Sequence, residues 1–327
     1  MINRECDTPV LIYLNGSSRT EQQVKRKLAF EEETKIKHLT DFPARRDFDT
    51  WTDVITRRQD EREELLGIPE HIEVEIRSRR PILLSLFADS HGGAEGFDAR
   101  RFAKDVSLVK EVEGYSITVG DLTDSFFFQP GVDEQILQGQ EQILYMQSAL
   151  DELAEGNRLI AGIGGDHDLW SKDKMGAHTL YHQFHERYNA HYMEGVSHIT
   201  IGLNNGEETI DYRLTGSHRH RGFSVYNDSH AALRQEADEG RGADISFTAH
   251  QHIKGHNRQV VMEHGGKERV IDMLALGSYR TSDRYSRKKG FPRAHEESMG
   301  AFGLVLHPEE KIVEVKWTIE EAIKNLK

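Results

Sequence analysis

Residues 159–168 have the sequence Leu-Ile-Ala-Gly-Ile-Gly-Gly-Asp-His-Asp. The first five are apolar and have the length and composition of a buried strand. The glycine pair that follows lets the backbone turn sharply, so that Asp166, His167 and Asp168 emerge together where the strand ends. A tight turn capped by an aspartate would give the same short pattern. Taken alone, the stretch leaves both interpretations open.

Four further strand-like runs end in polar groups of the same kind. These runs and the residues after them are 82–88 with Asp89 and His91, 115–119 with Asp121, 212–214 with His218 and His220, and 244–248 with His250 and His252. Residues i and i+2 of an extended chain share a face, so an Asp-x-His pair sends both side chains into one site. Carboxylate and imidazole are ligands that divalent metals accept. The five endings together predict a metal site.

The order of elements predicts an α/β fold. Helical patterns over 102–111 and 135–155 alternate with the strands at 82–88, 115–119 and 159–163. Such β-loop-α alternation is typical of sheets whose active groups lie at the carboxyl ends of the strands. Beyond about residue 198 strands predominate. We assign residues 81–327 to one main domain.

Residues 1–80 differ from this domain and are expected to form a mainly helical extension. The patterns over 20–38 and 49–66 are helical, but their apolar stripes are too narrow to build a separate core. The segment is interpreted as an appendage packed on the main domain, with a partner-docking arm as the alternative. Residues 71–77 alternate strictly between polar and apolar, which predicts a half-exposed strand.

Composition limits the classes of protein that remain. The chain has 327 residues, one cysteine, 18 histidines and a net charge of -13. A single cysteine excludes an intramolecular disulfide and any multi-thiolate metal site. The beginning lacks the pattern of a signal peptide and no apolar run is long enough for a membrane span, so we expect a cytoplasmic protein without a membrane partner. The negative charge argues against a generally basic nucleic-acid binder.

A segment near the end, residues 280–293, is strongly basic although the whole chain has a negative net charge. It contains one acid and six basic residues, namely Arg280, Arg284, Arg287, Lys288, Lys289 and Arg293. Tyr279 immediately precedes the segment, and Tyr285 lies within it. One interpretation is a clamp that holds a polyanionic substrate and stacks bases on tyrosine. The other is a solvated loop that balances nearby acids, and the sequence favours neither.

The five polar endings resemble a known set of motifs. Their order is similar to D-x-H, G-D-x-x-D, G-N-H-D/E, a lone H and G-H-x-H in the calcineurin-like metallophosphoesterases. Each motif is weak alone, but five in order are specific, and they cover residues 81–327. Residues 219–227 and 277–279 look particularly like phage-encoded members. The resemblance implies a four-layer α/β/β/α sandwich.

The same resemblance implies a centre of two divalent metal ions. It assigns the first ion to Asp89, His91, Asp121 and His252, and the second to Asp121, Asp166, His218 and His250. A hydroxide that bridges the metals would attack phosphorus. His167 would contact the phosphate and protonate the leaving oxygen, while Asp168 would orient its ring. Mn, Fe and Zn all accept such ligands, so the metal identity stays open.

Two positions depart from the family pattern. Asp166 replaces the family's asparagine, which should tighten metal binding and reduce the Lewis acidity of the ions. Ala249 replaces the glycine of the last motif. A further ambiguity is internal, since His218 and His220 both follow a strand. We prefer His218 because it lies nearer the strand end.

The activity expected from these features is hydrolysis of a phosphodiester in nucleic acid or a nucleotide. A phosphomonoesterase that acts on a small metabolite or a phosphoprotein is the alternative. A non-catalytic scaffold is less favoured, because the ligand set is complete. Substrate contacts are expected from Arg219, Arg221, Arg280, Arg287 and Lys288. The oligomeric state stays open.

Overall fold

The computed structural model describes residues 47–66, 68–125, 131–169, 183–222, 224, 226–262, 266, 268–281, 284–288 and 295–326. The chain divides into two compact units, Met1–Gly67 and Ile68–Lys327. In the first unit the described element is the helix α2, Phe48–Leu66, which matches the helix predicted over 49–66. The helix predicted over 20–38 lies outside the described residues, and the packing of this unit on the other stays a prediction.

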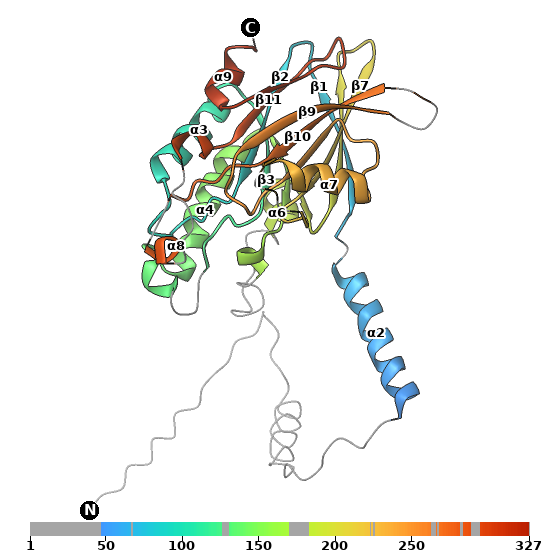
Figure 1. The fold of residues 1–327 in the computed structure, drawn as a ribbon, viewed down its shortest axis with the longest axis vertical. Helices are drawn as coiled ribbons and strands as arrows, with labels where there is room; N and C mark the ends of the chain where they lie inside the picture. The colour runs from blue at the N-terminus through green and yellow to red at the C-terminus, as the bar shows by residue number, and fades with distance from the viewer. Residues whose placement is uncertain are drawn as a thin grey trace, which may run out of the picture. The chain divides into compact units, whose positions relative to one another are not determined.

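One six-stranded sheet carries the first three polar endings. Its order is β12-β11-β2-β3-β4-β5. The strands β2 to β5 are parallel, while β11 runs antiparallel to β2 and to β12 (Figure 1). The strands are β2 Ile82–Ala88, β3 Tyr115–Val119, β4 Leu159–Ile163, β5 His191–Met193, β11 Phe302–Leu306 and β12 Val313–Lys316.

The second six-stranded sheet carries the other two endings. Its order is β1-β6-β7-β8-β10-β9, with β7 parallel to β8. The strands are β1 His71–Arg77, β6 Ser197–Asn204, β7 Thr209–Ser217, β8 Ile245–Thr248, β9 Gly255–Met262 and β10 Glu268–Ala275. The strand β1 alternates between exposed and covered residues, as its sequence predicts.

The pairing of β1 also places the domain boundary. The sequence interpretation divided the chain after residue 80, whereas the structure separates the two units after Gly67. The reason is that β1 pairs with β6 along its whole length, from His71 opposite His198 to Arg77 opposite Asn204. A half-polar strand looks peripheral in sequence, but here it is the edge of a sheet in the larger unit.

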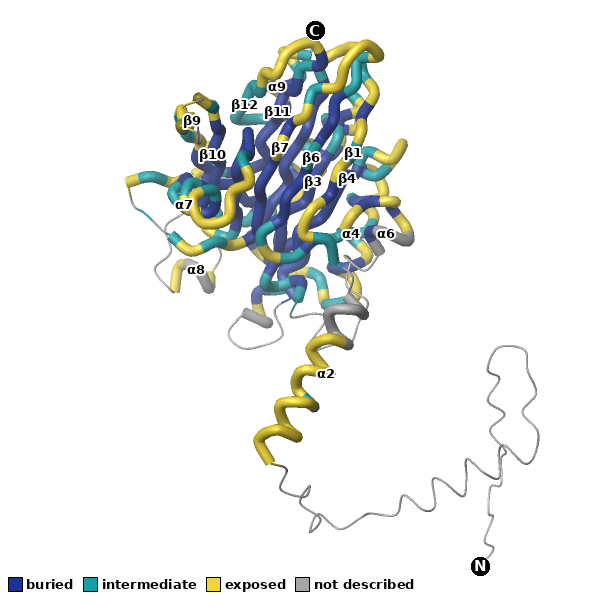
Figure 2. Tube along the Cα trace, turned by 90° about the vertical axis from the view of Figure 1, so that its right-hand side faces the viewer, coloured by how far each residue is buried: buried dark blue, intermediate teal, exposed yellow. Residues whose placement is uncertain are grey.

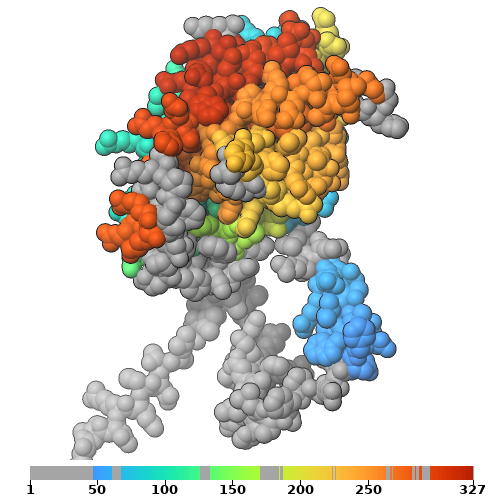
Figure 3. Space-filling view, in the orientation of Figure 1, coloured from blue at the N-terminus to red at the C-terminus, as the bar shows by residue number. Residues whose placement is uncertain are grey.

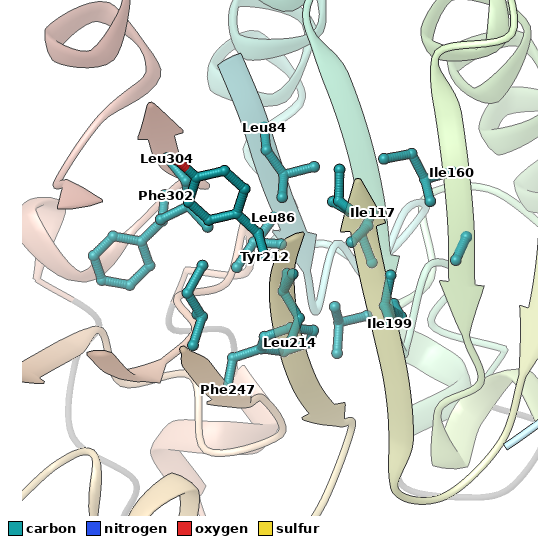
Figure 4. Packing of buried hydrophobic residues seen from close by; sticks show 14 of the residues in the cluster. Leu84, Leu86, Ile117, Ile160, Ile199, Tyr212, Leu214, Phe247, Phe302 and Leu304 are labelled. Carbon is teal, nitrogen blue, oxygen red and sulfur yellow. The ribbon is translucent and has the colours of Figure 1, made fainter. Parts of the chain in front are cut away.

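The main core lies between the two sheets (Figure 4). Leu86 and Ile117 from the first sheet pack in one cluster with Ile199, Leu214 and Phe247 from the second. All five side chains are fully buried or nearly so. Figure 2 shows that the central strands are buried along most of their length. This apolar packing holds the carboxyl ends of the strands in fixed relative positions.

Helices cover the outer faces of both sheets and complete the sandwich. On the first sheet lie α3 Ala99–Glu111, α4 Gly139–Ala154, α6 Gln183–Tyr188 and α9 Ile319–Ile323, and on the second lies α7 His230–Glu239. The remaining short elements are η1 Gly131–Glu134, α8 Arg284–Lys288 and η3 Glu296–Ser298. The predicted four-layer α/β/β/α architecture is confirmed.

The helix α4 begins later than the expected residue 135. The backbone N–H of Gln138 donates to Glu141 Oε2 at 2.9 Å, which caps the helix at that point. Gln135 instead forms a bridge with Ala94 in the loop after β2. Among the described residues, no helix combines the length and the apolar character needed to cross a membrane.

Candidate metal centre

The polar endings gather at one end of the sandwich. Parallel strands end at the same edge of a sheet, so the residues after β2, β3 and β4 are neighbours. The residues after β7 and β8 reach the same place from the second sheet. Contacts across the sheets establish the meeting point, because Asp89 after β2 lies 3.6 Å from His218 after β7, measured from Oδ1 to Nδ1.

The first ligand group consists of Asp89, His91 and His252. The Nε2 atoms of His91 and His252 face each other at 3.1 Å. Asp89 Oδ1 lies 4.0 Å from His252 Nε2, and Asp121 Oδ2 lies 3.9 Å from His91 Nε2. These four residues are the set that the family resemblance assigns to the first ion.

The second ligand group consists of Asp121, His218 and His250. Asp121 Oδ2 lies 3.3 Å from His218 Nε2, and His218 Nε2 lies 3.2 Å from His250 Nδ1. Asp166 adds its Oδ2 atom 3.7 Å from His250 Nδ1. Asp121 Oδ2 therefore stands between the two groups, 3.9 Å from His91 Nε2 and 3.3 Å from His218 Nε2.

Buried polar atoms support a fit to divalent cations. Asp89 Oδ1 is buried and has no hydrogen-bond partner among the described residues. Two pairs of imidazole nitrogens point at each other within 3.2 Å. Metal–ligand bonds are about 2.0–2.2 Å long, so ligands of one ion stand roughly 3–4 Å apart. The spacing, the ligand types and the unpartnered oxygen fit divalent cations.

The pKa values of the first group also suit metal binding. Burial lowers the pKa of His91 to about 4. Burial, together with the charge of His91, lowers the pKa of His252 well below its usual value. Both imidazoles are therefore neutral near pH 7, the form in which a histidine binds metal.

The second group is electrostatically different. Burial alone would lower the pKa of His218, but the charge and hydrogen bond of Asp121 and the charges of Asp89 and Asp168 raise it to about 10. Burial raises the pKa of Asp89 well above its usual value, and the charge of Asp121 adds to this effect. A cation that binds here must displace a proton from His218.

The backbone bends unusually at this centre. Five of the seven expected ligands have left-handed φ angles, namely 44° at Asp89, 48° at His91, 43° at Asp121, 71° at His250 and 54° at His252. Such angles are uncommon in residues other than glycine and cost roughly 1–3 kcal/mol each. The strained turns direct side chains from several strand ends into one small volume.

Hydrogen bonds between loops hold these turns in place. The backbone N–H of His250 donates to Asp89 Oδ2 at 2.8 Å, and that of His167 donates to Asp121 Oδ1 at 2.9 Å. Gly165 allows the second contact, because a Cβ atom there would lie 2.2 Å from the backbone nitrogen of Asp121. This close approach gives a physical reason for the second glycine of the pair in the 159–168 stretch.

His167 lies beside the two groups. Its Nε2 atom is 4.0 Å from Asp121 Oδ2, and its ring packs edge-on against that of His91 with centroids 4.9 Å apart. Its Nδ1 atom contacts the backbone carbonyl of Asp124. These contacts orient the side chain at the edge of the centre.

Asp168 is buried beneath the loops. It accepts hydrogen bonds from the backbone N–H groups of Leu122 at 3.1 Å and Gly165 at 3.3 Å. Burial and the charge of Asp121 raise its pKa to about 6. These contacts fasten the loops after β3 and β4 to each other. The expected role of Asp168 in orienting the His167 ring stays a prediction.

Comparisons with known proteins add little to this geometry. No family model matches the chain, and no curated protein matches it. The chain is similar to a solved metallophosphoesterase from Sphaerobacter thermophilus, with 15% identity, coverage of 72% of this chain and 87% of that one, and a TM-score of 0.33. It is also similar to GAP50, the anchor in the inner membrane complex of Plasmodium, with 9% identity, coverage of 74% and 86%, and a TM-score of 0.40. At such low scores the likenesses carry no argument about this chain.

The structure separates the two candidate histidines. His218 lies in the second ligand group, whereas His220 Nε2 lies 3.8 Å from Glu239 at the end of α7. Arg221 also lies against α7, where it pairs with Asp238 at 2.9 Å. Arg219 turns back toward the centre, with Nη1 3.5 Å from Asp166 Oδ2. Of these arginines, the structure brings Arg219 to the mouth of the site.

The basic segment divides into an inner and an outer part. Arg280 turns inward and contacts Asp124 Oδ1 through Nη1 at 2.6 Å. Arg287 and Lys288 are exposed on α8, which packs against η1 and lies on the molecular surface (Figure 3). Lys289 and Arg293 lie outside the described residues.

Asp124 is a site residue that the sequence interpretation did not single out. It is fully buried, and its Oδ1 atom lies 2.8 Å from His91 Nδ1. The signal was present as the second aspartate of the G-D-x-x-D motif, four residues after Gly120. Nothing in the spacing alone says that this carboxylate contacts a ligand histidine.

Proposed function

We propose that the chain is a metal-dependent phosphoesterase that uses two divalent ions to cleave phosphodiesters in nucleic acid or nucleotides. The observation that carries the proposal is the pair of Asp/His groups on either side of Asp121, with His167 at their edge. The order of these residues in the chain matches the motif order of the calcineurin-like metallophosphoesterases.

The residues suggest a division of roles. Two divalent ions, when bound, would polarise the phosphoryl oxygens and activate water. His167 would donate a proton to the leaving oxygen, since its ring is held beside Asp121 and is partly accessible. Arg219, beside Asp166 and 65% exposed, would pair with a phosphate oxygen at the mouth.

Three features support a large substrate. The second-site ligands Asp166 and His250 are 38% and 29% exposed, and His252 is 30% exposed, so the centre opens to solvent. The exposed cations Arg287 and Lys288 of α8 follow within eight residues of Arg280, which reaches the centre. In Figures 1 and 2, α8 lies toward the end of the sheets where β3 and β4 terminate.

The inward turn of Arg280 favours a second candidate, a phosphomonoesterase. Its contact with Asp124 removes one cation from the surface that would hold a polyanion. A small phosphorylated substrate would need the centre and Arg219 alone. A cytoplasmic setting, expected from the sequence, stays a prediction.

Parallel assays with Mn²⁺ test the function. We expect hydrolysis of a chromogenic phosphodiester and of single-stranded DNA to exceed that of a chromogenic monoester. Asp121→Asn should abolish all three, because one neutral amide replaces the anion shared by both groups. Asp151→Asn is the matched control, since Asp151 pairs with Arg187 at an exposed site. Full turnover in Asp121→Asn would remove Asp121 from the centre, and faster monoester cleavage would favour the phosphatase. Replacing Mn²⁺ with Fe²⁺ or Zn²⁺ addresses the metal identity.

A further inference from the structure

A third cluster of metal-type ligands adjoins the two groups. It consists of His91, Asp124 and His167. Asp124 Oδ1 lies 2.8 Å from His91 Nδ1 and 3.8 Å from His167 Nδ1. A cation already occupies this cluster, because Arg280 Nη1 lies 2.6 Å from Asp124 Oδ1 and 3.4 Å from His91 Nδ1. The cluster is therefore completed by a guanidinium of the chain itself.

Arg280 is held firmly in this position. Its backbone N–H donates to Ser278 Oγ at 2.9 Å, and Ser278 Oγ donates to the carbonyl of Asp89 at 2.7 Å. Arg280 also forms a bridge with Phe97, and the N–H of Thr281 donates to the carbonyl of Gly96 at 2.6 Å. The segment that carries Arg280 is thus fastened to the loop after β2, which holds the first ligands. Its side chain is 13% exposed.

Asp124 needs such a partner because it is fully buried. Its Oδ1 atom lies 2.8 Å from His91 Nδ1 and 2.6 Å from Arg280 Nη1, so two side chains with N–H groups meet this one oxygen. Gln135 donates to its other oxygen at 2.5 Å, and Gln142 of α4 donates to Gln135 Oε1 at 2.5 Å. The carboxylate is therefore held on several sides.

The contact with Asp124 determines which ring nitrogen of His91 is available to bind a metal. A carboxylate only accepts hydrogen bonds, so Nδ1 of His91 carries the proton and Nε2 keeps its lone pair. Nε2 is the atom that faces His252 at 3.1 Å in the first ligand group. Partners of this kind orient ligand histidines, and removing them typically lowers metal affinity about 10–100-fold.

We propose that Arg280 is a positioning residue for the first metal site, acting through Asp124 on His91, and that it does not serve chiefly as a substrate clamp. The guanidinium offsets the buried charge of Asp124 and keeps this carboxylate on the Nδ1 side of His91, away from the ion. The proposal rests on the metal centre of the proposed function. It gives an inner cation of the basic segment a role that differs from that of the exposed cations on α8.

The test is a calorimetric titration of the metal-free full chain with Mn²⁺, which measures the affinity of each metal site. His91→Ala and His218→Ala identify which binding step belongs to which site. We expect Arg280→Met to weaken the first site at least 10-fold and the second less than 3-fold. Arg187→Met is the control, because Arg187 forms a bidentate pair with Asp151 at an exposed site and should change neither. Arg280→Lys should recover most of the affinity, since it keeps the charge.

A double-mutant cycle separates this role from a merely structural one. If Arg280 acts through Asp124, adding Arg280→Met to Asp124→Asn should weaken the first site less than 3-fold further. If Arg280→Met does not fold, the same double-mutant cycle is measured with Arg280→Gln. The glutamine amide removes the charge and keeps a hydrogen-bond donor. Unchanged affinity, equal weakening of both sites or a full further loss in the Asp124→Asn background would each overturn the proposal. A wild-type chain that binds two ions but cleaves no phosphate ester would contradict the proposed function. The metal affinities of the Arg280 variants could still be measured and would still test this proposal.

Discussion

Gly120 shows how closely single residues fit around the centre. It follows β3 with φ at 66°, and a Cβ atom there would lie 2.0 Å from His218 Nδ1. His218 comes from the other sheet and lies nearly a hundred residues later in the chain. The glycine before Asp121 is therefore required by a histidine that the local sequence does not indicate.

We expect Gly120→Ala to displace His218 and to weaken the second metal site at least about tenfold, as loss of a ligand contact does. The control is Gly195→Ala, because Gly195 has the same φ of 66° but a Cβ atom there would meet nothing within 4 Å. Both variants carry the left-handed strain of about 1–2 kcal/mol, and only one carries the clash. Mn²⁺ affinity and thermal midpoint measure the two effects. Equal losses in the two variants would show that strain, not the clash, is responsible.

The two histidines after β7 give a second comparison. His218→Ala should cost metal affinity strongly, since its Nε2 lies 3.3 Å from Asp121 Oδ2. His220→Ala should cost little, because that ring lies beside Glu239 and the carbonyl of Arg221. Metal content after gel filtration measures the difference. The reverse pattern would move the ligand assignment to His220.

The short helix α8 allows the substrate class to be tested. If Arg287 and Lys288 contact phosphates of single-stranded DNA, log K should fall with log salt by about 0.7 per contact. Replacing both with Ala should then flatten the slope by about 1.4 units and raise KM for DNA. Hydrolysis of a small chromogenic diester should stay nearly unchanged, because that substrate reaches only the centre.

A variant of equal net charge controls for this effect. Lys104→Ala with Arg187→Ala removes two exposed cations on α3 and α6. It should leave the salt slope unchanged. An equal change of the salt slope in both double variants would indicate a long-range electrostatic effect of net charge instead of direct contact between α8 and DNA. No change in either would make α8 a solvated surface and favour the small-substrate phosphatase.

The whole larger unit should depend on its metals for stability. Asp89, Asp121 and Asp168 are buried close together, and the charge of Asp121 raises the pKa of the other two. Bound cations offset this repulsion. At a free concentration a hundredfold above Kd, one ion stabilises the folded state by about 2.7 kcal/mol.

We therefore expect chelation to lower the thermal midpoint by roughly 5 °C for each ion removed from a domain of this size. Asp121→Asn, which weakens both sites, should show a smaller shift on chelation. Differential scanning fluorimetry with and without EDTA measures it. An unchanged midpoint in the wild-type chain would mean that the Asp/His groups hold no ion that matters to folding.

Much of the fold could be predicted from local signals. The runs at 82–88, 115–119 and 159–163 are apolar and short, and each is a strand with those bounds. The helices α2 and α3 also follow their patterns. The strand β9 and the helix α7 escaped notice, because β9 mixes polar and apolar residues and α7 is mostly polar. Their stability comes from pairing with β10 and packing on the second sheet.

The amino-acid sequence by itself determined which chemistry this chain can carry, because each strand and the polar residues after it are neighbours along the backbone. Tertiary structure alone decided three further points: that β1 belongs to the larger unit, that His218 and not His220 faces Asp121, and that Arg280 turns inward to Asp124. Each of these depends on a contact between residues more than 90 positions apart. Sheet order and strand register decide such contacts, and no local pattern contains them.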